Sequence, residues 1–236
     1  MVRRTKEEAQ QTRDALLDAA ERVFERRGVA GTSLQEVAEA AGVTRGAVYW
    51  HFRDKADLFN AMMDRAILPF EPQWHEAAAT DVADPLRRLQ DVMLDVLGRV
   101  ASDERLRRVA AISTHKVEYV GEHDPIRERH LRVRGQAHQS FTQLLRQAAA
   151  AGQLARGVSP EHAAYALHAL IDGLVANWTL DCQAFDLRCI GGSAVRLMLA
   201  GLTGVPAAEP AEAPAGAAAT PVPRGPHAAG RTAPRA

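Results

Sequence analysis

Apolar residues recur at helical spacing along most of the chain, whereas the alternation typical of strands is scarce. The first apolar stripe predicts an amphipathic helix over residues 11–27, and it consists of Leu16, Leu17, Ala20, Val23 and Phe24. The same pattern predicts further helices over residues 33–41, 44–52, 54–68, 84–100, 103–117, 124–151, 160–180 and 187–203. The ordered part of the chain is therefore expected to be all-α.

Residues 32–55 fit two short helices joined by a tight turn. Ser33 and Glu36 have the spacing of a capping box at the start of the first helix. A capping box that begins one residue earlier is the alternative register. Gly42 ends this helix, because glycine accepts the left-handed backbone that a helix end often needs. Thr44 can cap the second helix. This arrangement is a helix-turn-helix pattern.

The second short helix leaves aromatic and polar residues for its outer face, namely Arg45, Gly46, Tyr49, Trp50 and His51. Arg45 can donate two hydrogen bonds to a guanine edge, whereas Tyr49 and His51 can bind phosphates. Gly46 costs a helix about 1 kcal/mol relative to alanine. A smooth helix face that approaches a DNA backbone closely would justify that cost. These residues favour DNA reading over plain packing of a helix-turn-helix inside an enzyme.

Two strings in this region, A-G-V-T-R-G-A-V-Y-W-H-F at 41–52 and K-A-D-L-F at 55–59, resemble the DNA-binding domain of the TetR/AcrR family of repressors. Weaker strings at 115–122 and 177–187 are similar to AcrR-type repressors of multidrug efflux operons. The resemblance extends to about residue 203. It implies a three-helix DNA-binding domain followed by a larger helical domain that binds ligand and dimerises. It also implies a homodimer on double-stranded, palindromic operator DNA that a small hydrophobic or drug-like effector releases.

The expected organisation follows from these strings and from a change in composition. The DNA-binding domain is expected over 1–53, a linking helix over 54–68, and the ligand-binding and dimerisation domain over 69–204. Beyond residue 204 the chain is rich in proline and alanine, so residues 205–236 are expected to be a disordered tail.

The expected DNA-binding residues are Arg3, Arg4, Ser33, Thr44, Arg45, Gly46, Tyr49, Trp50, His51 and Lys55. Arg3 and Arg4 form a short basic arm, for which a solvated terminus is the alternative. The resemblance implies that Lys55, at the start of a helix, clamps a phosphate. A solvated lysine in a capping turn is the alternative there.

The helix over 160–180 has two apolar faces, which indicates two partners. One face, together with two residues of the last helix, is assigned to the dimer interface that the resemblance implies; its residues are Leu167, Leu170, Leu174, Trp178, Val195 and Met198. The alternative is one thick intramolecular core.

The second face of this helix carries His168, Ile171, Asp172 and Val175. Asp172 lies among apolar neighbours, and burying it without a partner is costly, so it either meets a partner or lines a cavity. The resemblance implies a drug pocket with further positions at Leu89, Val92, Val96, Ala110, Thr114, Phe141 and Leu145. Thr114, His168 and Asp172 would be the polar anchors. Ala110 and Thr114 are smaller and less polar than residues often found there, which puts the ligand set of relatives in doubt. Core packing is the alternative for each apolar position.

Composition narrows the function classes. The formal net charge is zero, so any electrostatic attraction to DNA must be local. Cys182 and Cys189 suggest reduced thiols, and no segment is apolar enough to span a membrane, so a cytoplasmic protein is expected.

No nucleophile motif or phosphate loop indicates an enzyme, and no cofactor is expected. The histidines between residues 115 and 138 are too far apart along a helix to share one metal.

Two rival hypotheses remain. The protein could bind DNA without small-molecule control, being constitutive or switched by Cys182 or Cys189. It could also be an enzyme or adaptor with an incidental helix-turn-helix.

Overall fold

The computed structural model describes residues 6–67, 82–119 and 125–204, and all regular elements in these ranges are helices. They are α1 (Lys6–Arg27), α2 (Leu34–Ala40), α3 (Arg45–His51), α4 (Lys55–Ile67), α6 (Pro85–Ser102), α7 (Glu104–His115), α8 (Pro125–Ala150), α9 (Pro160–Leu180) and α10 (Leu187–Thr203). The predicted all-α fold is confirmed. Arg3, Arg4 and the predicted tail over 205–236 lie outside the described residues.

Helix starts and ends follow the local signals in the sequence. The Ser33 side chain accepts a hydrogen bond from the Glu36 N–H, while the Glu36 carboxylate accepts one from the Ser33 N–H at 2.8 Å. Gly42 then ends the segment with φ of +68°. Thr44 caps α3 by accepting from the Ala47 N–H at 3.3 Å. The caps therefore fix the turn between α2 and α3.

The first helix is longer than predicted, since it begins at Lys6 rather than near residue 11. Glu7 and Glu8 occupy its first turn, where negative charge interacts favourably with the helix dipole. The apolar stripe used for the prediction begins only at Leu16, so the polar first turns carried no periodic signal.

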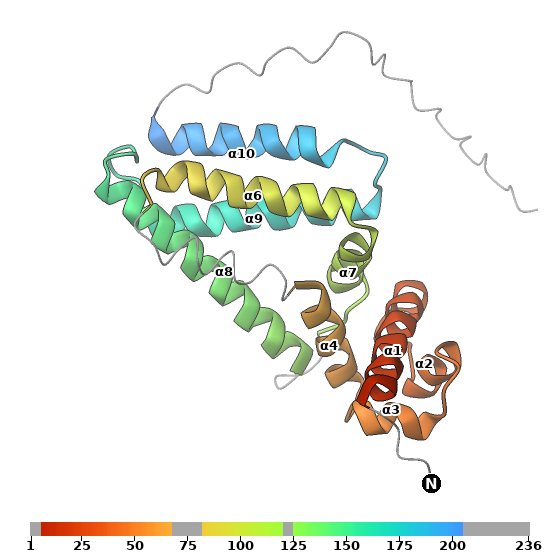
Figure 1. Ribbon diagram of the computed structural model, residues 1–236. Helices are drawn as coiled ribbons and strands as arrows, with labels where there is room; N and C mark the ends of the chain where they lie inside the picture. Colours follow the sequence, from red (N-terminus) through yellow and green to blue (C-terminus); the bar gives the residue numbers. More distant parts are fainter. Residues whose placement is uncertain (1–5, 68–81, 120–124, 205–236) are drawn as a thin grey trace, which may run out of the picture.

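Helices α1 to α4 pack around one apolar core, at the lower right of Figure 1. Phe24, Val48 and Leu58 are fully buried in it. The same core includes Val109 and Ile112 of α7. The N-terminal helices are thus packed directly against the rest of the protein, through α4 and α7.

The larger unit is built on α6, α8, α9 and α10. Figure 1 shows α6, α9 and α10 side by side, with α8 slanting from their end towards α4. Gly191 permits a close approach of α10 to α6, because a Cβ atom there would lie 2.8 Å from Cδ1 of Leu97. None of the helices described is both long and apolar enough to cross a lipid bilayer.

The face assigned to the dimer interface lies largely inside the protomer. Leu167 and Val195 are fully buried, Trp178 is 6% exposed, and the Trp178 indole N–H donates to the Phe185 carbonyl at 3.1 Å. The other three residues, Leu170, Leu174 and Met198, are partly buried against the same core. The interface assignment is therefore wrong for Leu167, Trp178 and Val195, because all three are buried in the apolar core that α6, α8, α9 and α10 form within the protomer.

Candidate DNA-binding surface and ligand pocket

Helix α3 presents a polar and aromatic surface. Its Val48 is fully buried, whereas Arg45, Gly46 and Tyr49 are exposed and Trp50 is 73% exposed. The Arg45 guanidinium lies 5.4 Å from the centre of the Tyr49 ring and donates to the Tyr49 hydroxyl at 3.3 Å. Exposed aromatic rings beside an arginine are suited to contacts with a nucleic acid backbone and base edges.

His51 is less available than predicted, because its side chain is only half-exposed. Its ring lies edge-on against the ring of Trp50, with a centroid distance of 4.5 Å, and 6.2 Å from the ring of Phe52. Packing between these rings orients Trp50 as well as His51.

Lys55 has partners within the protein. Its ammonium group donates to the carbonyls of Ala30 and Thr32, both at 2.9 Å, and so ties the loop between α1 and α2 to the start of α4. Lysine has three N–H donors, so one is left for a phosphate. The sequence-based prediction did not include Arg53, which lies two residues after the end of α3. Its side chain is 87% exposed and lies 3.5 Å from the Asp57 carboxylate.

Two further predicted residues have structural roles. The side-chain oxygens of Ser33 and Thr44 accept backbone N–H groups at the starts of α2 and α3. Their hydroxyl groups remain near the surface, because both residues are exposed.

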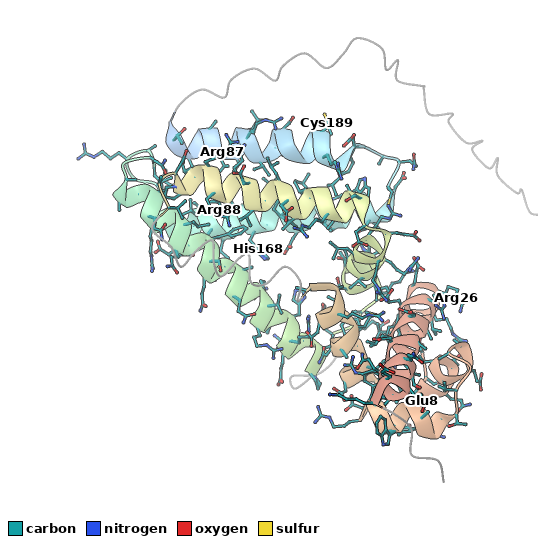
Figure 2. The ribbon with its side chains drawn as sticks, viewed as in Figure 1. Glu8, Arg26, Arg87, Arg88, His168 and Cys189 are labelled. Carbon is teal, nitrogen blue, oxygen red and sulfur yellow. The ribbon has the colours of Figure 1, made fainter. Side chains whose placement is uncertain are left out.

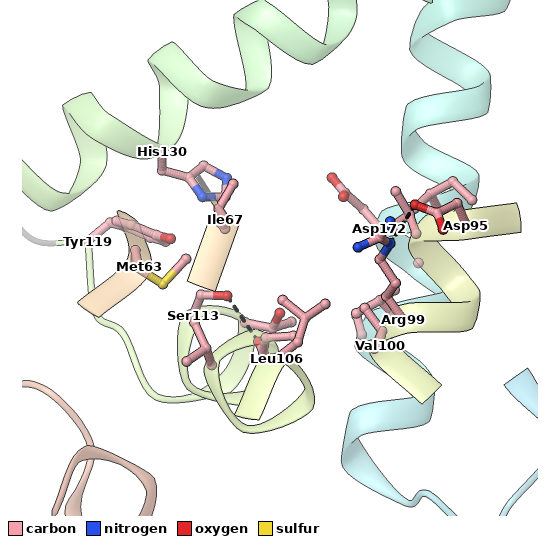
Figure 3. A pocket seen from close by; sticks show the side chains of 18 residues that line it. Met63, Ile67, Asp95, Arg99, Val100, Leu106, Ser113, Tyr119, His130 and Asp172 are labelled. Atoms are coloured by element: carbon pink, nitrogen blue, oxygen red, sulfur yellow. Dashed lines mark hydrogen bonds and ion pairs between the residues drawn. The ribbon is translucent and has the colours of Figure 1, made fainter. Parts of the chain in front are cut away.

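A cavity of about 540 Å³ lies between α4, α6, α7 and α9, with one side chain from α8. Figure 3 shows the side chains that converge on it. Six of the predicted ligand residues line it: Val96, Ala110, Thr114, Ile171, Asp172 and Val175. The prediction missed other lining residues, including Met63, Ile67, Arg99, Ser113, Tyr119 and His130.

A second cavity of about 130 Å³ adjoins the first and shares Val96, Ile171 and Asp172 with it. Predicted residues that line this second cavity are Val92, Val96, Phe141, His168, Ile171 and Asp172. Leu89 and Leu145 line neither cavity. Both are fully buried in the core between α6 and α8, which is the alternative raised for them.

The polar groups of the main cavity are mostly paired. Arg99 forms an ion pair with Asp95 at 2.6 Å, and the Ser113 hydroxyl donates to the Ala110 carbonyl at 3.0 Å. His130 comes from α8, and desolvation by the surrounding protein lowers its pKa, partly offset by the charge of Asp172. The neutral imidazole is thus favoured, and it can both donate and accept a hydrogen bond.

Asp172 is not the buried carboxylate that the sequence suggested. Its side chain is 63% exposed, and its Oδ2 lies 3.2 Å from Nδ1 of His168. The cost of burying an unpaired charge therefore does not arise here. Asp172 instead stands where the two cavities meet, as a polar group at their opening.

The outer side of α9 and α10 carries exposed apolar residues. Leu180 at the end of α9 is 70% exposed, and Ile190 and Leu197 of α10 are 51% and 59% exposed. Cys189, labelled in Figure 2, lies on the exposed side of α10, whereas Cys182 is half-buried; both are free thiols.

Two family models match the chain. One described as "Bacterial regulatory proteins, tetR family" matches residues 16–62. The other, described as "MAATS-type transcriptional repressor, C-terminal region", matches residues 84–202. Together they cover all of α2, α3 and α6 to α9, the second half of α1, α4 as far as Met62, and α10 except its last residue.

Individual proteins are similar over most of their length. The chain is 41% identical to the transcriptional regulator TtgR of Pseudomonas putida over 187 residues, which cover 79% of this chain and 89% of that protein. It is 38% identical to the regulator AcrR of Shigella flexneri, over 80% of this chain and 87% of that protein.

Solved structures are similar as well. NalD, the secondary repressor of the MexAB-OprM multidrug efflux pump in Pseudomonas aeruginosa, superposes with a TM-score of 0.77 at 37% identity, over 84% of this chain and 98% of NalD. A complex of SmeT with triclosan gives a TM-score of 0.75 at 32% identity, over 87% of this chain and all of that chain. SmeT is described as the repressor of the SmeDEF multidrug efflux pump of Stenotrophomonas maltophilia.

Proposed function

The chain belongs to the TetR family of transcriptional repressors, and on that premise we propose that it is a homodimer that represses a multidrug efflux operon and leaves its operator when a small hydrophobic compound binds. The family consists of regulators rather than enzymes. Acting on chromosomal DNA would place the protein in the cytoplasm.

Operator binding is assigned to α3. Its exposed Arg45, Tyr49 and Trp50 stand on a helix whose buried Val48 fixes it to the core. In a twofold dimer, two such helices enter successive major grooves about 34 Å apart. Arg53 and the remaining N–H of Lys55 would add phosphate contacts beside the groove.

Ligand control is the part that the main cavity supports. Its volume of about 540 Å³ is that of a site for a drug-sized molecule. Its wall is mostly apolar, with Met63, Ile67, Val96, Val100, Leu106, Val109, Ile171 and Val175. An open cavity of this size disfavours the rival in which this region is a filled core. The efflux assignment follows from relatives that are named as repressors of multidrug efflux systems.

Dimerisation is assigned to the outer faces of α9 and α10, in place of the buried face first expected. Leu180, Ile190 and Leu197 are exposed there, together with the small residues Ala169 and Gly201. Exposed apolar side chains that gather on one surface mark an interaction site, and small residues let two helices approach closely. A four-helix bundle of two α9 and two α10 helices would cover this surface.

Helix α4 connects the two activities. Three residues separate it from α3, and its Met63 and Ile67 line the main cavity. A ligand that binds one orientation of α4 more tightly shifts the protein towards that orientation, by as much as its affinities for the two states differ. The changed spacing of the two α3 helices then weakens operator binding.

A band-shift experiment with DNA from upstream of the protein's own gene tests the proposal. We expect a specific shift that triclosan reverses, triclosan being the compound in the SmeT complex. Tyr49→Ala should reduce operator affinity at least about tenfold, a loss of about 1.4 kcal/mol, without lowering thermal stability. Tyr119→Ala, a tyrosine of the cavity wall, is the control and should bind the operator normally without ligand. The absence of a specific shift for the unmodified protein contradicts DNA binding, and a shift that hydrophobic compounds leave unchanged contradicts ligand control.

A further inference from the structure

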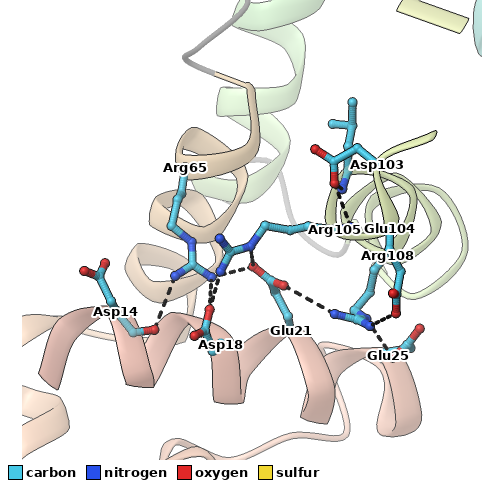
Figure 4. A network of polar contacts seen from close by, with 10 residues as sticks. Asp14, Asp18, Glu21, Glu25, Arg65, Asp103, Glu104, Arg105 and Arg108 are labelled. Atoms are coloured by element: carbon cyan, nitrogen blue, oxygen red, sulfur yellow. Dashed lines mark hydrogen bonds and ion pairs between the residues drawn. The ribbon is translucent and has the colours of Figure 1, made fainter. Parts of the chain in front are cut away.

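A carboxylate is buried where the DNA-binding unit meets the ligand-binding unit. Glu21 of α1 is 2% exposed, and Figure 4 shows arginines reaching it from two other helices. Its Oε1 accepts from Nη2 of Arg65 on α4 at 2.5 Å and from Nε of Arg105 on α7 at 2.9 Å. Its Oε2 lies 3.8 Å from Nη1 of Arg108, also on α7. One side chain of α1 therefore holds both α4 and α7.

The neighbouring carboxylates of α1 differ from Glu21 in exposure. Asp18 contacts Arg65 at 2.8 Å and also contacts Arg105, whereas Glu25 contacts Arg108 at 3.2 Å. The side chains of Asp18 and Glu25 are 47% and 49% exposed, so water competes for both. A carboxylate that is removed from water depends on its cationic partners, and of these three carboxylates Glu21 is the one that is buried.

The same two helices line the main cavity with their other faces. On α4, the cavity residues Met63 and Ile67 flank Arg65 by two positions on each side. On α7, Leu106 and Val109 each directly follow one of the arginines that hold Glu21. A ligand in the cavity thus touches the helices whose far sides hold the buried carboxylate.

We propose that Glu21 is the positioning residue that couples occupancy of the cavity to the orientation of the DNA-binding unit; this rests on the ligand control proposed above. Arg65 and Arg105 share a single oxygen atom, so a displacement of α4 relative to α7 strains or breaks one of the two hydrogen bonds. The junction would then pass between an arrangement with both bonds and one with a single bond, and coupling between distant sites requires such a change.

The far end of α7 is attached to the chain just after α1. The Val29 N–H, in the loop after α1, donates to the Lys116 carbonyl at the end of α7 at 2.8 Å. Because this backbone bond lies beyond the arginines along α7, we expect it to persist while a shift at the cavity changes the contacts of Glu21.

A double-mutant cycle tests the coupling without knowledge of the natural ligand. Ala110→Phe places a ring in the cavity as a permanent occupant, since Ala110 lies on its wall and the cavity has room. Operator affinity of the full chain is measured by fluorescence anisotropy with DNA from upstream of its own gene. Allosteric couplings are commonly about 5- to 150-fold, so we expect Ala110→Phe to weaken operator binding at least about tenfold. In the Glu21→Gln background the same substitution should weaken it less than about threefold.

Glu25→Gln is the matched control, because it makes the same change one turn further along α1 at a half-exposed carboxylate whose ion pair, within the described residues, is with Arg108. The effect of Ala110→Phe should persist in full in this background. A full effect in the Glu21→Gln background, or an equal loss in both backgrounds, overturns the role of Glu21.

Circular dichroism and light scattering establish that each variant is folded and dimeric. If Glu21→Gln does not fold, Arg105→Gln takes its place, because it removes the α7 donor to the Glu21 oxygen that Arg65 also contacts. An undiminished effect of Ala110→Phe beside Arg105→Gln then overturns the inference. If Ala110→Phe leaves operator binding of the otherwise unmodified protein unchanged, ligand control itself fails, and the coupling role fails with it.

Discussion

Gly46→Ala should make the protein more stable and yet a weaker DNA binder. Gly46 is the second residue of α3 and is exposed. A Cβ atom added there would have the Thr44 hydroxyl oxygen, at 3.9 Å, as its nearest neighbour. The protein thus accepts the methyl group without a clash, and any penalty must come from outside the protomer.

The magnitude of each effect follows from this geometry. Alanine is favoured over glycine in a helix by about 0.5 to 1 kcal/mol. For a chain of this size, 1 kcal/mol corresponds to a shift of about 2 to 4 °C in the thermal midpoint, so a rise of about 1 to 4 °C is expected. On the operator, the methyl group would stand between α3 and the DNA backbone, and we expect affinity to fall at least about tenfold, or 1.4 kcal/mol.

Thermal melting and fluorescence anisotropy measure the two effects separately. Gly98→Ala is the matched control, since it lies in α6, where an added Cβ has no neighbour within 4 Å. It should raise the thermal midpoint similarly and leave operator affinity unchanged. Normal operator binding by the Gly46→Ala variant would refute the close approach of this face of α3 to DNA.

Three other substitutions test separate parts of the structure. Leu197→Glu should convert the dimer to monomers in light scattering, because it charges an exposed apolar position of α10; an unchanged dimer would place the interface elsewhere. Lys55→Met removes two charge-assisted hydrogen bonds and should lower the free energy of unfolding by about 1 to 2 kcal/mol in urea titrations. It should also reduce the salt dependence of operator binding by about one ion, and an unaltered salt dependence would leave Lys55 only its structural role. Desolvation lowers the pKa of His130 below its ordinary 6.5, so the unfolded chain binds more protons at this residue than the folded protein does. The free energy of unfolding should therefore fall as pH decreases from 6.5 through the folded-state pKa, and His130→Gln should flatten this part of the pH profile.

The DNA-binding unit was predictable because its signals are local. Capping residues such as Ser33 and Thr44, and Gly42 between the helices, set the turn through contacts within a few residues. The structure has these caps and the turn at the predicted positions. Their predicted contacts with DNA stay a prediction.

The faces of α9 and α10 were harder to assign, because helical spacing tells which residues share a face but not what covers it. Leu167 and Leu197 are both leucines on long amphipathic helices, yet one is fully buried and the other largely exposed. The difference arises from the position of α10 against α6 and α9, which no local pattern encodes. The prediction also did not include α4 in the cavity wall, for the same reason. In the sequence, Met63 cannot be told from any other core residue of a linking helix.

Glu21 did leave a signal in the sequence. It lies four residues after Leu17 and three before Phe24, and both of these are fully buried, so it shares the apolar face of α1. A carboxylate on such a face requires cationic partners from elsewhere in the fold. Its arginines are 44 and 84 or more residues away, and their identity could come only from the tertiary structure.

The ion pairs on the two sides of α4 indicate the direction in which it moves. Asp64 accepts from Nε of Arg129 on α8 at 2.9 Å, and Asp64 is the only carboxylate that pairs with this buried arginine in the described part of the chain. Separating α4 from α8 would leave the buried Arg129 without a carboxylate partner among the described residues, whereas Glu21 keeps Arg105 and Arg108 if Arg65 leaves it. We therefore expect a ligand not to pull α4 away from α8. Arg65, which contacts α1, can release Glu21 and still keep Asp18 at 2.8 Å. Helix α4 should thus move together with α8 and away from Glu21, which turns the α3 helices of the dimer without breaking the contact of α4 with α8.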